Sequence, residues 1–292
     1  MRIRVYQINP EKDIKNVKFR GFEETARKGG VDFSTYKKTF DGYVEAKMLD
    51  EVYNTFNGHS RVPTHQGHSL SVSDIVEVLG DIPEIYGKID FLYANENDHV
   101  GKIGETLYYT DKESFEAEIK ASNDCGRPIN ATVIESEHFK LTEEGVYFCD
   151  DIGWEKINID TGEGEDMEGV RVLMINPGKP PVETRVIDEL EHWQNAVSDH
   201  GEEAYMEVTY PFEDSAVIVG NDEAKLIGMK GNRHVLGSIY AGPIYIVNDD
   251  GQGGFCDLTD EQIEKYSKMF ETPEDISDDE TQGDCGFIIT GW

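Results

Sequence analysis

The charge of this chain limits what it can fold into more than any motif does. It carries 59 Asp and Glu residues against 27 Lys and Arg, a formal net charge of −32 over 292 residues. Self-repulsion of this size opposes a compact state, and it favours solubility or the recognition of cationic partners. The charge is uneven, because residues 1–50 hold 11 basic and 8 acidic side chains while the other 242 hold 16 and 51. Apolar residues make up 38% of the chain, which is modest but enough to build cores.

Length and composition favour two domains, since 292 residues are long for a single hydrophobic core. The N-terminus, MRIRVYQINPEKD, lacks the apolar core of a signal peptide, and no apolar run approaches the roughly 18 residues of a membrane helix. The four cysteines include no CxxC pair, which fits a reducing compartment. We therefore expect a cytoplasmic protein with no membrane contact. Its fold class is expected to be α+β, with two small mixed domains of short sheets flanked by helices.

A glycine- and acid-rich stretch divides the chain. The sequence DTGEGEDMEG at 160–169 has three glycines, five acidic residues and one methionine as its only large apolar residue. We predict a first domain at 1–160 with an inserted subdomain at about 81–143, and a linker at 161–169. A second α+β domain is predicted at 170–271, followed by an acidic tail at 272–292.

Periodicity predicts the elements of the first half. Strands are expected at 2–8, 43–46, 89–94 and 129–135, and a new strand begins at Ile75. Residues 145–149 and 154–159 favour a hairpin. Leu49, Val52 and Phe56 recur at helical spacing, and Thr110 with Glu113 predicts a capping box for a short helix.

The second half follows the same logic. Strands are expected at 170–175, 204–209, 215–219 and 243–248. After Pro180 and Pro181, an amphipathic helix is predicted in which Val186, Leu190, Trp193 and Val197 share one face. Thr259 and Gln262 predict a capping box for a last helix.

Two regions resemble known families. YVEA, LDEVYNTFN, GHSLSVSDIVEVL and, after the insertion, GVYFCDDIGWEKI are similar to the YodL-like domain of phage and conjugative-plasmid proteins. VRVLMINPGKPPVETRVI, EVTYPFEDSAVIVGNDEAKLIG and LTDEQIEKYSKMF resemble a separate domain-of-unknown-function family from the same mobile elements. The resemblance implies an accessory protein of a phage or conjugative element, and it assigns no catalytic residue.

No complete catalytic or metal-binding signature is present. His59, His65 and His68 lack a known ligand spacing, and GHSLS lacks the closing glycine of a nucleophile elbow. Turn residues and alternate serines on a strand account for this segment more simply, and this alternation predicts that Leu70 and Val72 are buried. Asp111, Glu118 and Lys120 imitate a nuclease pattern but fall on a predicted helix, where neighbours at i and i+2 point apart. The turn at 248–251 has no calcium-loop register, and no phosphate-binding glycine motif occurs. We expect no metal and no cofactor.

The acidic surface gives the main functional hypothesis. Phosphate contacts need Lys and Arg, so the acidic part should not bind nucleic acid directly. Closely spaced carboxylates could instead imitate the duplex, which carries about one charge per 1.7 Å of axis. The expected partner is a host protein with a cationic groove, a nuclease or restriction component, which the chain would inhibit without chemistry of its own. The carboxylates expected to contact this partner are Glu163, Glu165, Asp166, Glu168, Asp278, Asp279 and Glu280.

Two alternatives remain open from the sequence. One is a small-ligand or enzymatic module, with a pocket around His68, Ser69 and Asp74 in the GHSLSVSD segment. The other is a protein–protein adaptor that recognises its partner without imitating DNA. An acidic surface that only confers solubility accounts for the charge equally simply.

Overall fold

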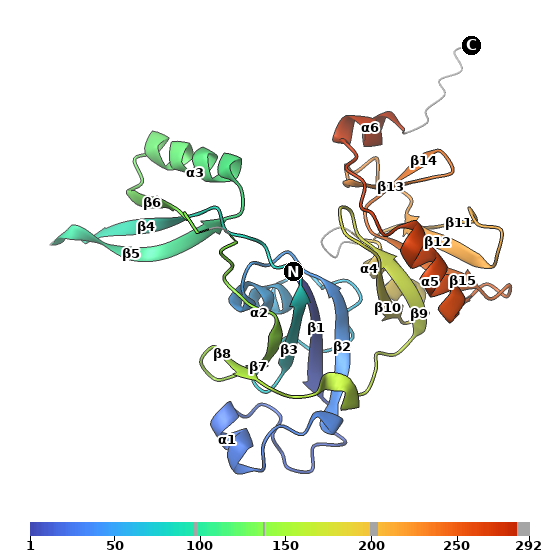
Figure 1. The fold of residues 1–292 in the computed structure, drawn as a ribbon, viewed down its shortest axis with the longest axis horizontal. Helices are drawn as coiled ribbons and strands as arrows, with labels where there is room; N and C mark the ends of the chain where they lie inside the picture. The colour runs from blue at the N-terminus through green and yellow to red at the C-terminus, as the bar shows by residue number, and fades with distance from the viewer. Residues whose placement is uncertain (96–97, 137, 199–203, 285–292) are drawn as a thin grey trace. The chain divides into compact units, whose positions relative to one another are not determined.

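The computed structural model describes residues 1–95, 98–136, 138–198 and 204–284 (Figure 1). Several small antiparallel sheets and six α-helices among these residues confirm the predicted α+β fold of two domains. By Cα proximity the chain also divides into two compact units. The first unit comprises Met1–Arg2, Tyr43–Tyr53 and Val78–Gly145, and the second comprises Ile3–Gly42, Asn54–Glu77 and Val146–Trp292. The domain, insertion, linker and tail boundaries expected from the sequence stay predictions.

The first sheet has the strand order β2-β1-β3-β7-β8. Its strands are β1 (Arg2–Ile8), β2 (Tyr36–Tyr43), β3 (Ile75–Gly80), β7 (Gly145–Cys149) and β8 (Trp154–Ile157), and α1 (Phe22–Arg27), η1 (Phe33–Thr35) and α2 (Leu49–Asn57) accompany them. Tyr6, Phe33 and Tyr36 form an aromatic core with Ile75 and Phe148. The β7–β8 hairpin and helix α2 were predicted. The strand expected at 43–46 is wrong, because β2 spans Tyr36–Tyr43 and ends where that strand was expected to begin. Burial along YKKTFDGY does not alternate, so this strand lacks the two-residue pattern that predicts one.

A three-stranded sheet with the order β5-β4-β6 forms a separate small core. It consists of β4 (Gly87–Asn95), β5 (Asp98–Tyr109) and β6 (Ile129–Val133), and α3 (Lys112–Asp124) packs on it through Phe115 against Ile89 and Phe91. The predicted cap is displaced by one residue. Asp111, not Thr110, is the N-cap, and its carboxylate accepts the Ser114 N–H at 2.8 Å. A carboxylate is a strong cap, which accounts for the shift.

The sheet of the second half has the order β10-β9-β15-β12-β11, and β16 also pairs with β15. Its strands are β9 (Val170–Ile175), β10 (Val182–Val186), β11 (Met206–Thr209), β12 (Ala216–Asn221), β15 (Ile244–Asp249) and β16 (Phe255–Cys256). Strands β12 and β15 are buried almost throughout, because both of their faces are covered. A separate hairpin joins β13 (Gly231–Val235) to β14 (Ser238–Ala241).

Helices cover both faces of this sheet. Ile244 and Ile246 of β15 pack in one core with Tyr266 of α5 (Asp260–Met269), whereas Tyr245, which points to the other face, lies against Trp193 of α4 (Leu190–Ala196). Such alternation follows from the two-residue period of a strand. The helix predicted to include Val186 is partly wrong. Residues 182–186 form β10, and α4 begins only at Leu190.

Part of the predicted acidic tail is folded. Helix α6 (Asp278–Gly283) begins with a capping box, and Ile276 and Thr281 near it are buried. They lie against Gly231 at the start of β13, where a Cβ atom would come 2.5 Å from the Thr281 hydroxyl. Asp284 completes the contact by pairing with Lys225 at 2.6 Å. Residues 285–292 of the predicted tail lie outside the described residues.

Candidate functional site

The GHSLSVSD segment at 67–74 is an irregular loop, not the alternating strand that its pattern favours. Ser73 explains the difference, because its φ of +77° reverses the chain just before β3. The Ser73 hydroxyl accepts the Phe19 N–H at 2.9 Å, and its own N–H donates to the Cys149 carbonyl at 2.9 Å. Leu70 is buried as expected, while Val72 is only half-buried.

A buried polar cluster lies beneath this loop. The Gln7 side-chain amide, on β1, donates to Asp74 Oδ2 at 2.8 Å and lies 3.0 Å from His68 Nδ1. The Ser71 N–H donates to the same Asp74 oxygen at 2.8 Å. Asp74 is fully buried, and this burial raises the pKa of its carboxyl to about 7, although the hydrogen bonds from Gln7 and Ser71 oppose the rise. The cluster therefore holds a carboxyl that can change its protonation near neutral pH.

Several buried polar atoms of residues 64–74, in this loop and just before it, have no hydrogen-bond partner among the described residues. They are Thr64 Oγ1, His65 Nε2, His68 Nε2 and Asp74 Oδ1. An unsatisfied buried polar group is costly and rare in folded proteins, and each one calls for an explanation. These four atoms lie within eleven residues of the sequence. A bound water or small polar ligand would supply their missing hydrogen-bond partners.

The alternative pocket residues are only partly brought together. His68 Nδ1 lies 3.9 Å from Asp74 Oδ2, with the Gln7 amide between them. Ser69 is exposed, and His68 Nδ1 faces its carbonyl oxygen at 2.7 Å and not its hydroxyl. A nucleophile needs its base within hydrogen-bond reach, so this geometry does not form a serine–histidine pair. Within the described ranges, no group of three or more His, Cys, Asp or Glu could hold a metal ion.

The linker carboxylates pair with the basic start of the chain. Lys37 lies on the edge strand β2, and its backbone forms a parallel β-bridge with Glu165. The Glu165 carboxylate also lies 2.6 Å from the Lys12 ammonium group. Glu168 pairs with Lys37, and Asp166 contacts Lys38 at 2.8 Å. Hydrogen bonds from Lys12 and Lys37 lower the pKa of Glu165 and Glu168 respectively. Glu163 closes η2 (Thr161–Glu163), and its side chain lies outside the described set.

The α6 carboxylates differ from those of the linker. Asp278 and Asp279 are exposed in the first turn of α6, and neither has an ion-pair partner within the described part of the chain. Glu280 is used locally, because its carboxylate accepts the hydroxyl and the N–H of Ser277, and these bonds lower its pKa. Of the predicted carboxylates whose side chains the structure describes, Asp278 and Asp279 are therefore the ones left for an external cation.

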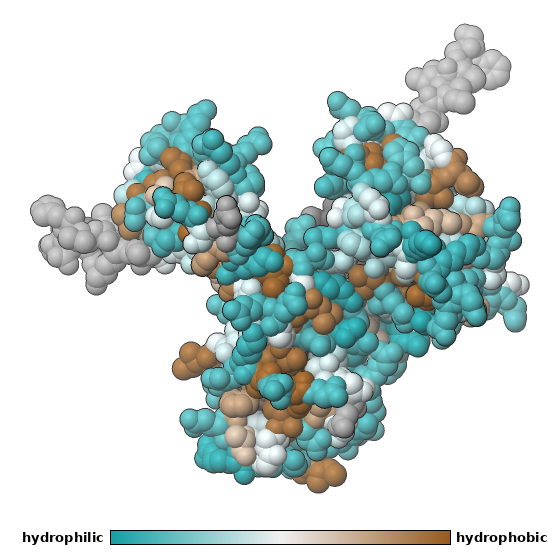
Figure 2. Space-filling view, in the orientation of Figure 1, coloured by the Kyte–Doolittle hydropathy of each residue, from teal (hydrophilic) through white to brown (hydrophobic). Residues whose placement is uncertain are grey.

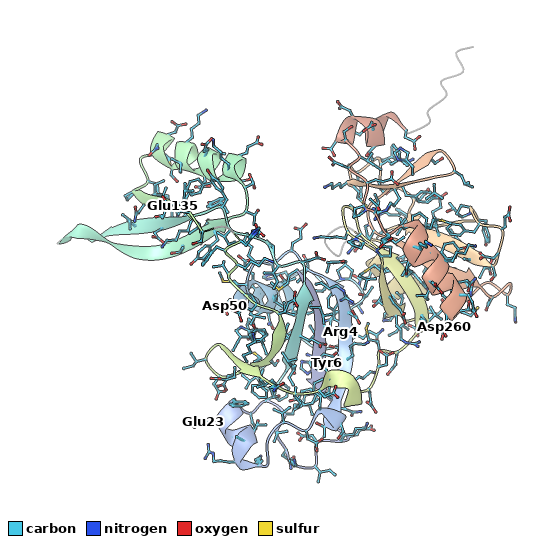
Figure 3. The ribbon with its side chains drawn as sticks, viewed as in Figure 1. Arg4, Tyr6, Glu23, Asp50, Glu135 and Asp260 are labelled. Carbon is cyan, nitrogen blue, oxygen red and sulfur yellow. The ribbon has the colours of Figure 1, made fainter. Side chains whose placement is uncertain are left out.

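Sequence reasoning missed a second polar network on the first sheet. Arg4 and Tyr6 project from β1 (Figure 3), and Arg4 contacts Asp41 at 2.9 Å and Glu77 at 3.5 Å. The Tyr6 hydroxyl donates to Glu77 at 2.8 Å. Lys38, which also reaches Asp41 at 3.4 Å, links this network to the linker. The alternation of Arg4 and Tyr6 along RIRVYQI was the available signal, since residues two apart share a face.

No helix among the described residues is long and apolar enough to cross a membrane. No curated protein and no solved structure matches the chain significantly. Residues 2–93 match the family model described as YodL-like domain, and residues 170–271 match the one described as Domain of unknown function (DUF3846), which confirms the resemblance predicted for both halves.

Proposed function

We propose that this chain is a non-catalytic binding protein of a phage or conjugative element that inhibits a host DNA-binding defence factor. The observation that carries the proposal is how the charge is distributed. Three of the basic residues near the N-terminus, Lys12, Lys37 and Lys38, pair with the linker, whereas residues 170–292 hold 25 acidic and 8 basic side chains, a net charge of −17. Hydrophilic residues cover most of the face of this region seen in Figure 2.

The exposed carboxylates of α6 and α5 are the centre of the proposed surface. Asp278 and Asp279 open α6, and Glu261 lies in the first turn of α5, whereas Asp260 beside it already pairs with Arg171 at 2.6 Å. A cationic groove that binds duplex DNA is attracted to closely spaced negative charges in the same way. In this role the acidic surface replaces the phosphates, and the inhibited protein supplies the Lys and Arg.

The test is capture from a host lysate followed by competition. The chain should retain a DNA-binding nuclease, excess duplex DNA should release it, and retention should weaken as salt rises because exposed charges are screened beyond about 8 Å at physiological ionic strength. An Asp278→Asn, Asp279→Asn variant should retain less nuclease. Its matched control is Glu113→Gln with Glu116→Gln on α3, which changes the net charge equally. A partner retained equally at high salt and in excess DNA would instead establish an adaptor without mimicry.

A second candidate function rests on the unpartnered atoms at 64–74. It is the binding of a small polar ligand beneath the loop, with Asp74 and His68 as its contacts. Ligand-observed NMR with a library of small polar metabolites tests it. A binder lost in His68→Ala supports this function, and a library with no such binder contradicts it.

A further inference from the structure

A cavity of about 270 Å³ lies where β11, β12 and β14 meet. Gly220 of β12 contributes to it and pairs directly with Glu207 of β11. A glycine inside a strand weakens the strand, and it often marks a place where a ligand approaches the backbone. A Cβ atom at Gly220 would meet only Ile244 Cγ2, at an ordinary 3.5 Å, so the space above this glycine is open.

The cavity is lined by polar and apolar residues in similar measure, and two of its lining residues are acidic. Ile239 and Ala241 are buried, and the ring of Tyr240 is fixed by a 2.6 Å hydrogen bond between its hydroxyl and that of Thr209. Glu207 and Asp222 are exposed at the rim, and in the described ranges neither has an ion-pair partner. Two carboxylates, one tyrosine ring and a few apolar side chains in one cavity suit a cation that carries an apolar stem.

The charge of the lining excludes an anionic ligand. Lys225 is the one Lys or Arg among the lining residues described, and it is paired with Asp284 at 2.6 Å. The same Asp284 oxygen also accepts the Ile239 N–H at 2.8 Å, so the end of α6 and the cavity lining are tied together at this carboxylate. The lysine charge is thus already compensated, and the two rim carboxylates leave the cavity negative.

We propose that this cavity binds an arginine side chain presented by the protein partner, an inference that rests on the proposed function. Its volume is below the roughly 300–1,000 Å³ of small-molecule pockets, which fits one side chain better than a cofactor. A guanidinium is planar, stacks on aromatic rings and pairs with carboxylates through several N–H groups. Exposed apolar residues beside the cavity favour a protein carrier. They are Tyr205, whose carbonyl accepts the Asp222 N–H at 2.8 Å, and Leu226 and Ile227, which follow Lys225.

The experiment titrates the full chain with N-acetyl-L-arginine amide, followed by two-dimensional amide NMR. Saturable shifts should appear at Gly220 and Ser238, and N-acetyl-citrulline amide, which is neutral and of similar shape, should cause none. Gly220→Val should abolish the shifts by filling the cavity. Glu207→Gln and Asp222→Asn should each weaken binding about fivefold, as expected for one exposed ion pair near 1 kcal/mol. Glu213→Gln, which changes the same charge outside the lining, should have no effect.

The following results would contradict the proposed arginine site or the proposed function. Equal shifts with citrulline, or no saturable shift with arginine, would overturn the inference. If Gly220→Val does not fold, as judged by its amide spectrum, the two carboxylate variants carry the test, and unchanged affinity in both overturns it. If the chain captures a nuclease but does not bind arginine, the arginine site is refuted and the proposed function is not. Arginine binding without any DNA-competed capture would refute the proposed function and leave the arginine site intact.

Discussion

Asp74 is the residue whose protonation this fold controls most directly. Its pKa rises from 3.8 to about 7 on folding because the carboxyl is buried. Between pH 4 and 7 the folded state therefore holds a proton that the unfolded state releases, so this residue makes stability fall as pH rises through that window. Burial lowers the pKa of His65 from 6.5 to about 4, which gives the opposite slope.

Asp74→Asn isolates the first of these effects. The variant should show a smaller loss of stability than the unmodified chain between pH 4 and 7, by up to about 1.4 kcal/mol for each pKa unit of the shift. Urea unfolding at a series of pH values measures the difference, and His65 cancels because it is present in both proteins. Parallel pH profiles for the two proteins would show that Asp74 is not protonated on folding.

Arg233 is a second buried charge, and its role is structural. Its guanidinium is 1% exposed and donates to the carbonyls of Asn232, Lys179 and Phe270 at 2.9, 2.8 and 3.2 Å. Phe270 is the C-cap of α5, where a cation is favourable. Arg233→Met should destabilise the chain by about 1–3 kcal/mol because it leaves buried carbonyls unpaired. Urea unfolding measures this, and the exposed Arg20→Met should change stability by less than about 0.5 kcal/mol.

The sequence predicts the burial of some single residues, but it does not predict contacts between residues that lie far apart along the chain. Burial of Leu70 was predicted from strand alternation and turn residues and is confirmed, although the segment is a loop and Val72 is only half-buried. The partner of Asp74 could not be found in this way, because Gln7 lies 67 residues away and meets it only when β1 lies beneath the loop. The positive φ of Ser73 was equally hidden, since the left-handed conformation is uncommon for a serine and follows from its tertiary contacts.

At the scale of elements, a local sequence pattern predicted the structure correctly where no second pattern in the same residues favoured another structure. Thr259 and Gln262 form the predicted capping box, with both reciprocal hydrogen bonds present. The helix expected from Val186 failed because 182–186 also has a two-residue period, and Val182, Thr184 and Val186 are buried against the sheet. The helical spacing of Val186 and Leu190 permitted a helix, but residues 182–186 instead form five backbone pairs with β9, and this pairing determines the structure.

The α5 cap supports a prediction at this scale. Thr259→Ala should cost about 1 kcal/mol, as N-cap replacements do. Gln262→Ala should cost more, because Gln262 also exchanges two buried hydrogen bonds with Asn248, at 2.7 and 2.8 Å. Thermal unfolding of both variants gives the order, with the exposed Thr272→Ala as a control. Equal losses for the two variants would mean that the Asn248 contact contributes nothing.

At the scale of the whole molecule, the uneven charge forms ion pairs within the chain, between the basic N-terminal part and the acidic linker. The basic excess of residues 1–50 was visible in the sequence, but its partners were not, because Lys37 and Glu168 are 131 residues apart. Pairing with Lys12, Lys37 and Lys38 holds the linker carboxylates against the edge strand β2. An exposed strand edge invites pairing with other chains, and the linker covers part of this one.

Removing two of these lysines should free the linker without unfolding the chain. In Lys12→Gln with Lys38→Gln, Glu165 loses its 2.6 Å partner and Asp166 its 2.8 Å partner, so limited proteolysis near 161–169 should become several-fold faster. The fragment that begins near Val170 should persist, since its core is formed by its own sheet and helices. Lys120→Gln with Lys268→Gln changes the net charge equally on exposed helix positions and should leave the cleavage rate unchanged. Equal cleavage rates in both double variants would show that the linker is held by its backbone bridge to β2 and not by its charges.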